Sequence, residues 1–303
     1  MSEQLSRPST TASIDQVEQA LLANDYVADR SLATAVFLAL ELARPLFVEG
    51  EAGVGKTELA KVLAAVLETR LIRLQCYEGL DVNTAVYEWD YPRQMLAIRL
   101  LEARGRAEQA TTRDIFGPEF LIKRPLLQAL ESSDGKAPLL LIDEIDRADE
   151  EFEAYLLEIL SDFQVSVPEI GTIRAAVPPV VVITSNRTRE VHDALKRRCL
   201  YHWIEYPTFE KELQIVLARV PRAPRQLAEQ LVRFVQRLRS EDLTKVPGIA
   251  ETLDWAAALM SLGVAQLEVP AVEATLGVGL KYEEDLRVLR GERVRELVVE
   301  ANG

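Results

Sequence analysis

The chain of 303 residues carries a formal net charge of −13, and 48% of its residues are hydrophobic. This apolar fraction is ordinary for a globular protein, and no apolar stretch approaches the roughly 20 residues that span a membrane. The acidic balance disfavours DNA or RNA as a partner, because such binding depends on basic side chains that neutralise phosphates. The N-terminus also lacks a signal-peptide pattern, so we expect a cytoplasmic protein without a membrane span.

The predicted elements follow a polar tail, expected over residues 1–12, and alternate between helices and short apolar strands as far as Pro207. Strands that are apolar on both faces and alternate with helices indicate a parallel sheet covered on both sides. An α/β domain is therefore expected over residues 13–207. In chain order, the helices are expected at 14–24, 30–42, 58–68, 93–104, 124–131 and 151–162, the strands at 46–48, 71–75, 138–142, 179–184 and 200–205, and a hairpin at 163–176.

The pattern changes after Pro207, where helical spacing of the apolar residues continues without a convincing strand. A small all-α domain is therefore expected over residues 208–303. Its helices are expected at 209–219, 224–239, 249–262 and 269–280.

A phosphate-binding pattern, G-x-x-x-x-G-K-[ST], occurs without a mismatch between the first apolar strand and the next helix. Its glycines let the backbone turn several N–H groups toward phosphates, and the helix that follows presents its positive end to the same anion. Lys56 is expected to bind the β- and γ-phosphates, and the Thr57 hydroxyl is expected to bind Mg²⁺. The pattern predicts a nucleoside triphosphate site made by Gly50, Glu51, Ala52, Gly53, Val54, Gly55, Lys56 and Thr57.

Two acids, Asp143 and Glu144, directly follow the apolar strand at 138–142. Ligands of open α/β sheets bind at the carboxyl ends of strands, so Asp143 is expected to hold Mg²⁺ and Glu144 to activate the attacking water. The alternative interpretation is a helix N-cap, which acids often form after a strand. The phosphate-binding pattern upstream favours the first interpretation.

Asn186 follows the strand at 179–184 and is expected beside the carboxyl end of the Asp143 strand. There its amide could bond the γ-phosphate or position the water, while a turn residue is the alternative. Arg197 and Arg198 follow a short predicted helix. An arginine there could neutralise transition-state charge in the site of a neighbouring subunit, and a solvated basic helix end is the alternative.

Together these motifs resemble those of an AAA+ ATPase, and more finely those of the MoxR group. The finer resemblance rests on Phe116-Gly117-Pro118, on the run Asp-Glu-Ile-Asp-Arg-Ala that starts at Asp143, and on the hairpin at 165–176. The stretch Glu88–Gln94 resembles the CoxD-type branch, which is associated with carbon monoxide dehydrogenase maturation.

The resemblance implies a P-loop αβα sandwich with a helical lid, which hydrolyses ATP with Mg²⁺ in a hexameric ring whose nucleotides lie at subunit interfaces. It also implies a chaperone that matures a metalloenzyme such as a molybdenum hydroxylase or CO dehydrogenase, often with a von Willebrand A-type partner. By position, the implied motif residues are Lys56 and Thr57 for Walker A, Asp143 and Glu144 for Walker B, Asn186 for sensor 1, and Arg197 or the adjacent Arg198 for the arginine finger.

One departure concerns the start of the third lid helix, where many AAA+ proteins carry a sensor 2 arginine. The corresponding stretch, 247–253, contains no arginine. The aromatic residues Tyr87, Trp89 and Tyr91 have two interpretations, a pore lining that grips a polypeptide or ordinary packing. Two other functions stay open: a nucleotide-gated regulatory module with slow turnover, and a nucleic-acid motor, which the acidic charge disfavours.

Overall fold

The computed structural model describes residues 11–104, 115–132 and 135–303, so the tail expected at 1–12 lies almost wholly outside the described residues. The described chain divides into two compact units, whose limits differ from the domain limits expected at 13–207 and 208–303. Those domain limits stay a prediction. The first unit comprises the described residues up to Val17, Arg30–Glu49 and Ala60–His202, and the second comprises Glu18–Asp29, Gly50–Leu59 and Trp203–Gly303.

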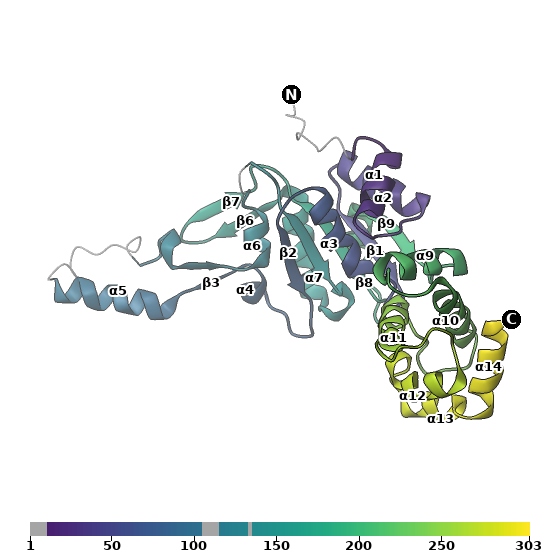
Figure 1. Ribbon diagram of the computed structural model, residues 1–303. Coiled ribbons are helices and arrows are strands. Elements are labelled where there is room, and N and C mark those ends of the chain that lie inside the picture. Colours follow the sequence, from purple (N-terminus) through teal and green to yellow (C-terminus); the bar gives the residue numbers. More distant parts are fainter. Residues whose placement is uncertain (1–10, 105–114, 133–134) are drawn as a thin grey trace. The chain divides into compact units, whose positions relative to one another are not determined.

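The centre of the first unit is a five-stranded sheet of order β2-β5-β8-β1-β9, as described residues show (Figure 1). The pairs β2–β5, β5–β8 and β8–β1 are parallel. Every residue of β1 and of β5 is buried, as expected for strands covered on both faces. The predicted α/β class with a parallel sheet is therefore confirmed. The strands are β1 Leu46–Gly50, β2 Leu71–Gln75, β5 Leu139–Asp143, β8 Val180–Ser185 and β9 Leu200–Ile204.

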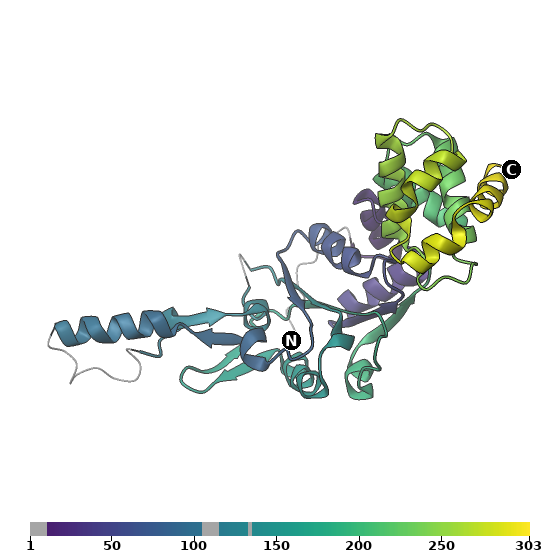
Figure 2. The ribbon, with the colours of Figure 1, turned by 90° about the horizontal axis from the view of Figure 1, so that it is seen from below.

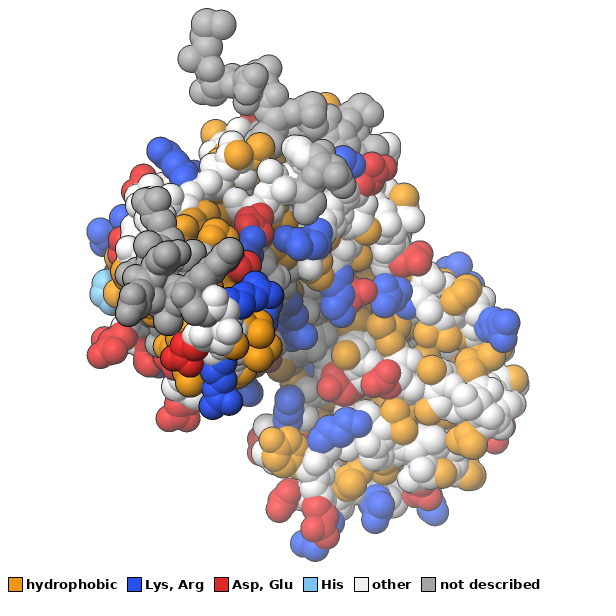
Figure 3. All heavy atoms as spheres, turned by 90° about the vertical axis from the view of Figure 1, so that its left-hand side faces the viewer, with side chains coloured by type: hydrophobic (Ala, Val, Ile, Leu, Met, Phe, Trp, Pro, Cys, Tyr) orange, Lys and Arg blue, Asp and Glu red, His pale blue; other side chains and the backbone are white. Residues whose placement is uncertain are grey.

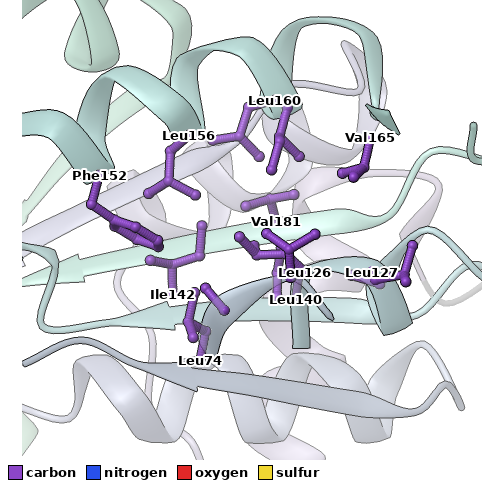
Figure 4. Packing of buried hydrophobic residues seen from close by; sticks show 14 of the residues in the cluster. Leu74, Leu126, Leu127, Leu140, Ile142, Phe152, Leu156, Leu160, Val165 and Val181 are labelled. Carbon is purple, nitrogen blue, oxygen red and sulfur yellow. The ribbon is translucent and has the colours of Figure 1, made fainter. Parts of the chain in front are cut away.

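The core of the first unit forms where helix α7 packs on the sheet. Its Phe152, Leu156 and Leu160, four residues apart, point toward Ile142 and Val181 (Figure 4). Residues at this spacing lie on one face of a helix, and burying each such side chain stabilises the fold by roughly 1.5–3 kcal/mol. The helix begins after Asp149, whose side chain accepts a hydrogen bond of 2.8 Å from the Phe152 N–H.

In the part of the chain that the structure describes, two antiparallel pairs accompany the sheet. The pair β6–β7 is the hairpin that the sequence predicts. The pair β3–β4 was not predicted, and helix α5 separates its two strands in the sequence. Figures 1 and 2 both show α5 projecting beyond β3, away from the five-stranded sheet. These strands are β3 Tyr87–Trp89, β4 Leu121–Lys123, β6 Gln164–Val167 and β7 Gly171–Arg174.

The helices up to residue 198 match the predicted ones within a few residues, with one short addition, α4. Short 3₁₀ turns at Pro118–Phe120 and Ile145–Arg147 accompany them. The helices are α1 Ile14–Ala23, α2 Arg30–Glu41, α3 Lys56–Val66, α4 Val82–Ala85, α5 Tyr91–Ala103, α6 Pro125–Ala129, α7 Glu150–Asp162 and α8 Asp193–Arg198.

The C-terminal part of the second unit is helical, as predicted, and has its own core. The Phe234 and Trp255 rings meet edge to face at 5.6 Å, and the Trp255 indole donates a 2.8 Å hydrogen bond to the Thr275 hydroxyl. The last two helices, α13 and α14, were not predicted. The helices are α9 Phe209–Arg219, α10 Arg225–Leu238, α11 Ile249–Ser261, α12 Val269–Gly279, α13 Glu283–Leu289 and α14 Glu292–Asn302. Across the described residues, no helix combines the length and apolar character that crossing a bilayer requires.

Candidate nucleotide site

The phosphate-binding loop leaves β1 at Gly50 and enters α3 at Lys56. Gly53 and Gly55 have φ angles of 79° and 96°, in the left-handed region that favours glycine. Gly50 is required for a different reason: a Cβ there would lie 2.3 Å from the Ile204 carbonyl oxygen. The backbone geometry of the loop therefore requires glycine at all three of these positions.

Lys56 lies against this loop. Its ammonium donates hydrogen bonds of 2.8 Å to the Gly50 carbonyl and 2.6 Å to the Glu51 carbonyl, and only 6% of the residue is exposed. A buried ammonium needs such partners because its desolvation is costly. The contacts hold the positive charge at the loop that the motif assigns to phosphate. Thr57, the next residue, is half-buried in the first turn of α3.

Asp143 ends β5 and is 1% exposed. The Thr184 hydroxyl donates a 2.5 Å hydrogen bond to its Oδ1. The Arg73 guanidinium donates to its Oδ2 through Nε at 3.0 Å and through Nη2 at 2.6 Å. Charge-assisted bonds of this kind offset the cost of burying a carboxylate. The structure thus fixes the rotamer of the expected Mg²⁺ ligand from two neighbouring strands, β2 and β8.

Glu144 adopts a left-handed conformation with φ of 56°, which is uncommon for a residue other than glycine. Its N–H donates a 3.0 Å hydrogen bond to the Thr184 hydroxyl, and its carboxylate pairs with Arg147 at 2.9 Å. Glu144 precedes the short 3₁₀ turn, yet its side chain makes no capping hydrogen bond there. Glu144 thus occupies the N-cap position of this turn, but its side chain does not act as the cap. Strained backbone of this kind clusters at functional sites.

Asn186 lies just beyond β8, the strand beside β5. Its N–H donates a 3.1 Å hydrogen bond to the buried carboxylate of Asp146, which also accepts bonds of 2.9 and 2.6 Å from Thr188. Burial raises the pKa of Asp146, but these hydrogen bonds outweigh burial and leave the pKa below its ordinary value. Asp146 lies in the 3₁₀ turn that follows Glu144, and its hydrogen bonds connect this turn to the segment at Asn186. The sequence did not identify this role.

A second buried acid, Glu49, lies one residue before the loop and is 3% exposed. It accepts hydrogen bonds from Ser185 at 3.2 Å and from Tyr201 at 2.9 Å, and it pairs with Lys196 at 3.5 Å. Burial first, and then the bond to Glu49, raise the pKa of Tyr201 to about 12. The sequence signal for this group of side chains was weak, because it consisted of one acid, Glu49, near the end of an apolar strand.

Arg197 and Arg198 end α8 and are both exposed. Arg44 donates hydrogen bonds of 2.8 and 3.2 Å to their main-chain carbonyls, which satisfies the end of the helix. The Arg198 guanidinium also donates to the Leu157 carbonyl. An exposed arginine pair at a fixed helix end is compatible with both interpretations given above, a charge for a neighbouring site or a solvated helix end.

The three aromatic residues of the stretch before α5 differ in their environments. Trp89 is 8% exposed and meets Phe116 edge to face at 5.1 Å, whereas Tyr91 is 62% exposed. Tyr87 is half-buried, and its ring meets the Trp89 ring edge to face, with 6.2 Å between the ring centroids. The packing interpretation therefore fits Trp89, while Tyr91 belongs to the surface. Figure 3 views the molecule from the side of α5, where hydrophobic side chains lie among charged ones.

A parallel sheet whose strand β1 leads into a glycine-rich loop with a buried lysine defines a P-loop protein of the α/β class. Residues 45–199, just over half of the chain, match the sequence profile of the AAA domain (dynein-related subfamily), and the chain belongs to this family.

Similar proteins include two from staphylococci. An uncharacterized protein of Staphylococcus haemolyticus is 22% identical over 281 residues, which cover 89% of this chain and 97% of that protein. One from Staphylococcus aureus strain NCTC 8325 is 23% identical over 229 residues, covering 73% of this chain and 78% of that protein.

Among solved structures, the chain is similar to Thermotoga maritima RuvB, a Holliday junction branch migration motor. That similarity has a TM-score of 0.48 and 18% identity, and it covers 94% of this chain and 78% of that one. A point mutant of the same Thermotoga protein gives a TM-score of 0.49 with 18% identity, covering 92% of this chain and 75% of that one.

Proposed function

We propose that this AAA protein hydrolyses ATP. The observation that supports the proposal most directly is the placement of Asp143 in the sheet. The register pairs Val48 of β1 with Thr184 of β8, and the Thr184 hydroxyl bonds Asp143. Since these parallel strands end at the same edge of the sheet, Asp143 lies at the edge where β1 ends, and the phosphate-binding pattern begins at the last residue of β1, Gly50.

The chemistry of each side chain determines the role that we propose for it. Lys56 would bind the β- and γ-phosphates through its ammonium. The Thr57 hydroxyl and the Asp143 carboxylate are hard oxygen donors, which fit Mg²⁺. When bound, the ion would neutralise charge that develops on the phosphates. Glu144 would orient and deprotonate the attacking water, with Asn186 helping to place it.

The finer proposal is a MoxR-type ATPase of the CoxD-like branch. It rests on the motif resemblance, and it implies a ring in which Arg197 or Arg198 completes the site of the neighbouring subunit. The client would be a metalloenzyme such as a molybdenum hydroxylase or CO dehydrogenase, with a von Willebrand A-type protein as a possible second partner. ATP-dependent ring formation, measured by light scattering, tests the oligomeric part of this proposal.

A second candidate is a nucleotide-gated module with slow turnover that controls a partner. The observation that favours it is the start of α11, where residues 247–253 carry no arginine to contact phosphate. A turnover that rises by orders of magnitude when a partner is added would support this candidate, and a fast turnover of the isolated chain would contradict it.

The central test compares ATP binding with ATP turnover. Lys56→Ala should abolish binding of a fluorescent ATP analogue. Glu144→Gln should keep binding but lower turnover at least about 100-fold, the size expected for the loss of a general base. Glu151→Gln, an exposed acid in α7, is the matched control and should behave as wild type. Unchanged turnover in Glu144→Gln would remove the role proposed for Glu144.

A further inference from the structure

The phosphate-binding loop touches the start of α11 within the second unit, backbone to backbone. The N–H groups of Ile249 and Ala250 lie 3.0 and 3.4 Å from the Gly53 carbonyl oxygen and donate to it. A Cβ on Gly248 would lie 2.9 Å from the Gly53 Cα and 3.0 Å from the Ala52 carbonyl oxygen. Neither distance is one that a real Cβ easily adopts, so the contact between Gly53 and Gly248 depends on both residues lacking a side chain.

Local hydrogen bonds fix the start of α11. The Glu251 carboxylate accepts a 3.0 Å hydrogen bond from the Gly248 N–H, in the manner of the acidic half of a capping box. The Thr252 N–H and hydroxyl both donate to the Gly248 carbonyl at 3.1 Å. The helix therefore presents the Ile249 N–H in a defined direction.

A buried ion pair holds the residues on both sides of Gly248. Glu212 is fully buried and accepts two 2.6 Å hydrogen bonds from Arg239. The Arg239 Nε donates to the Pro247 carbonyl at 2.8 Å, and the Thr252 hydroxyl donates to Glu212 at 2.8 Å. One buried pair thus anchors the residue before Gly248 and the first turn after it. This arrangement is a rigid support for the contact with Gly53.

We propose that Gly248 is a positioning residue for the phosphate-binding loop, and that α11 responds to bound nucleotide through the Gly53 carbonyl. This inference rests on the proposed ATP binding. The Gly53 carbonyl and the Val54 N–H are the two ends of one peptide group. In a loop of this type, such N–H groups face the phosphates.

Hydrogen bonds at the two ends of a peptide group polarise and strengthen each other. A phosphate at the Val54 N–H therefore strengthens the bond from Ile249 to Gly53, and the reverse holds because coupling between sites is reciprocal. The helical part of the second unit then senses the triphosphate through main-chain atoms, in the stretch that carries no arginine.

Gly248→Ala tests the contact, and Gly277→Ala in α12 is the matched control because a Cβ there meets nothing within 4 Å. Affinity for ATP is measured by titration of the full chain, with unfolding followed on the same samples. Gly248→Ala should weaken ATP binding about tenfold, within the usual range of such couplings, while Gly277→Ala binds as wild type. Equal ATP affinity in wild type and Gly248→Ala would overturn the proposal.

Hydrogen exchange of the Ile249 amide in the wild-type chain gives an independent measurement that needs no variant. The first N–H groups of a helix have no partner within the helix, so protection of this amide reports the bond to Gly53. ATP should slow its exchange several-fold. If wild type binds ATP and the exchange does not change, the coupling is refuted. If wild type does not bind ATP, the proposed function fails as well.

Discussion

Replacing Thr184 with valine should damage the site from within the sheet. Thr184 is 1% exposed. Its hydroxyl donates a 2.5 Å hydrogen bond to the Asp143 carboxylate and accepts a 3.0 Å hydrogen bond from the Glu144 N–H. Valine has nearly the same shape but no hydroxyl, so the substitution removes both hydrogen bonds without opening a cavity. Thr184→Val therefore isolates the contribution of a single oxygen atom.

The magnitude follows from what each partner loses. The bond to the Asp143 carboxylate is charge-assisted and contributes about 1.5–3 kcal/mol, and the bond from the half-buried Glu144 N–H about 1 kcal/mol. Arg73 still donates to the other oxygen of Asp143, which limits the damage. We expect the free energy of unfolding of the first unit to fall by about 2–4 kcal/mol.

Urea unfolding followed by circular dichroism measures the change, with an expected fall in the midpoint of about 1 M for a slope near 3 kcal/mol per M. Thr184→Ser is the control, because it keeps the hydroxyl and loses only a methyl group, about 1 kcal/mol. The Mg²⁺-dependent part of ATP affinity should also fall in Thr184→Val, since Asp143 loses its orientation. A Thr184→Val chain as stable as Thr184→Ser would refute the reasoning.

Two further predictions concern buried groups. Arg239→Leu should lower the free energy of unfolding of the second unit by about 3–5 kcal/mol, because it leaves Glu212 as a buried charge without its cation. Adding Glu212→Leu should recover part of this loss, because the unpaired buried charge is then removed as well. A loss below about 1 kcal/mol in Arg239→Leu would contradict this prediction. Burial raises the pKa of Cys76 and of Cys199 to about 12, from an ordinary value of 9.0, so iodoacetamide at pH 8 should modify them slowly in the folded chain and quickly in urea. Because a raised folded pKa stabilises the protein below the unfolded value, this stability should be lost as pH rises from about 9 toward 12, and pH-independent unfolding over that range would contradict the assignment.

Local patterns were enough to predict the elements and the loop. The run Gly50–Thr57 lies within one strand–loop–helix unit, so its residue types report the backbone that they require. Apolar strands such as β5 were located within one residue because burial on both faces leaves an uninterrupted apolar run. The α/β class and the helical C-terminal part follow from the same periodicity.

The short or amphipathic elements escaped prediction because their identity depends on what they pair with. The strands β3 and β4 have three residues each and exist through their pairing across α5. Helices α13 and α14 are rich in charged residues, and their few buried side chains gain their energy only against the other C-terminal helices.

The sequence by itself determined that this protein has a phosphate-binding loop in an α/β fold, because those signals are carried by neighbouring residues. Only the tertiary structure decided how the site is held. Thr184 meets Asp143, Ser185 meets Glu49, and Gly248 meets Gly53, each across a long stretch of chain. No local pattern encodes such contacts, because they arise from strand register and helix packing, which depend on the whole fold.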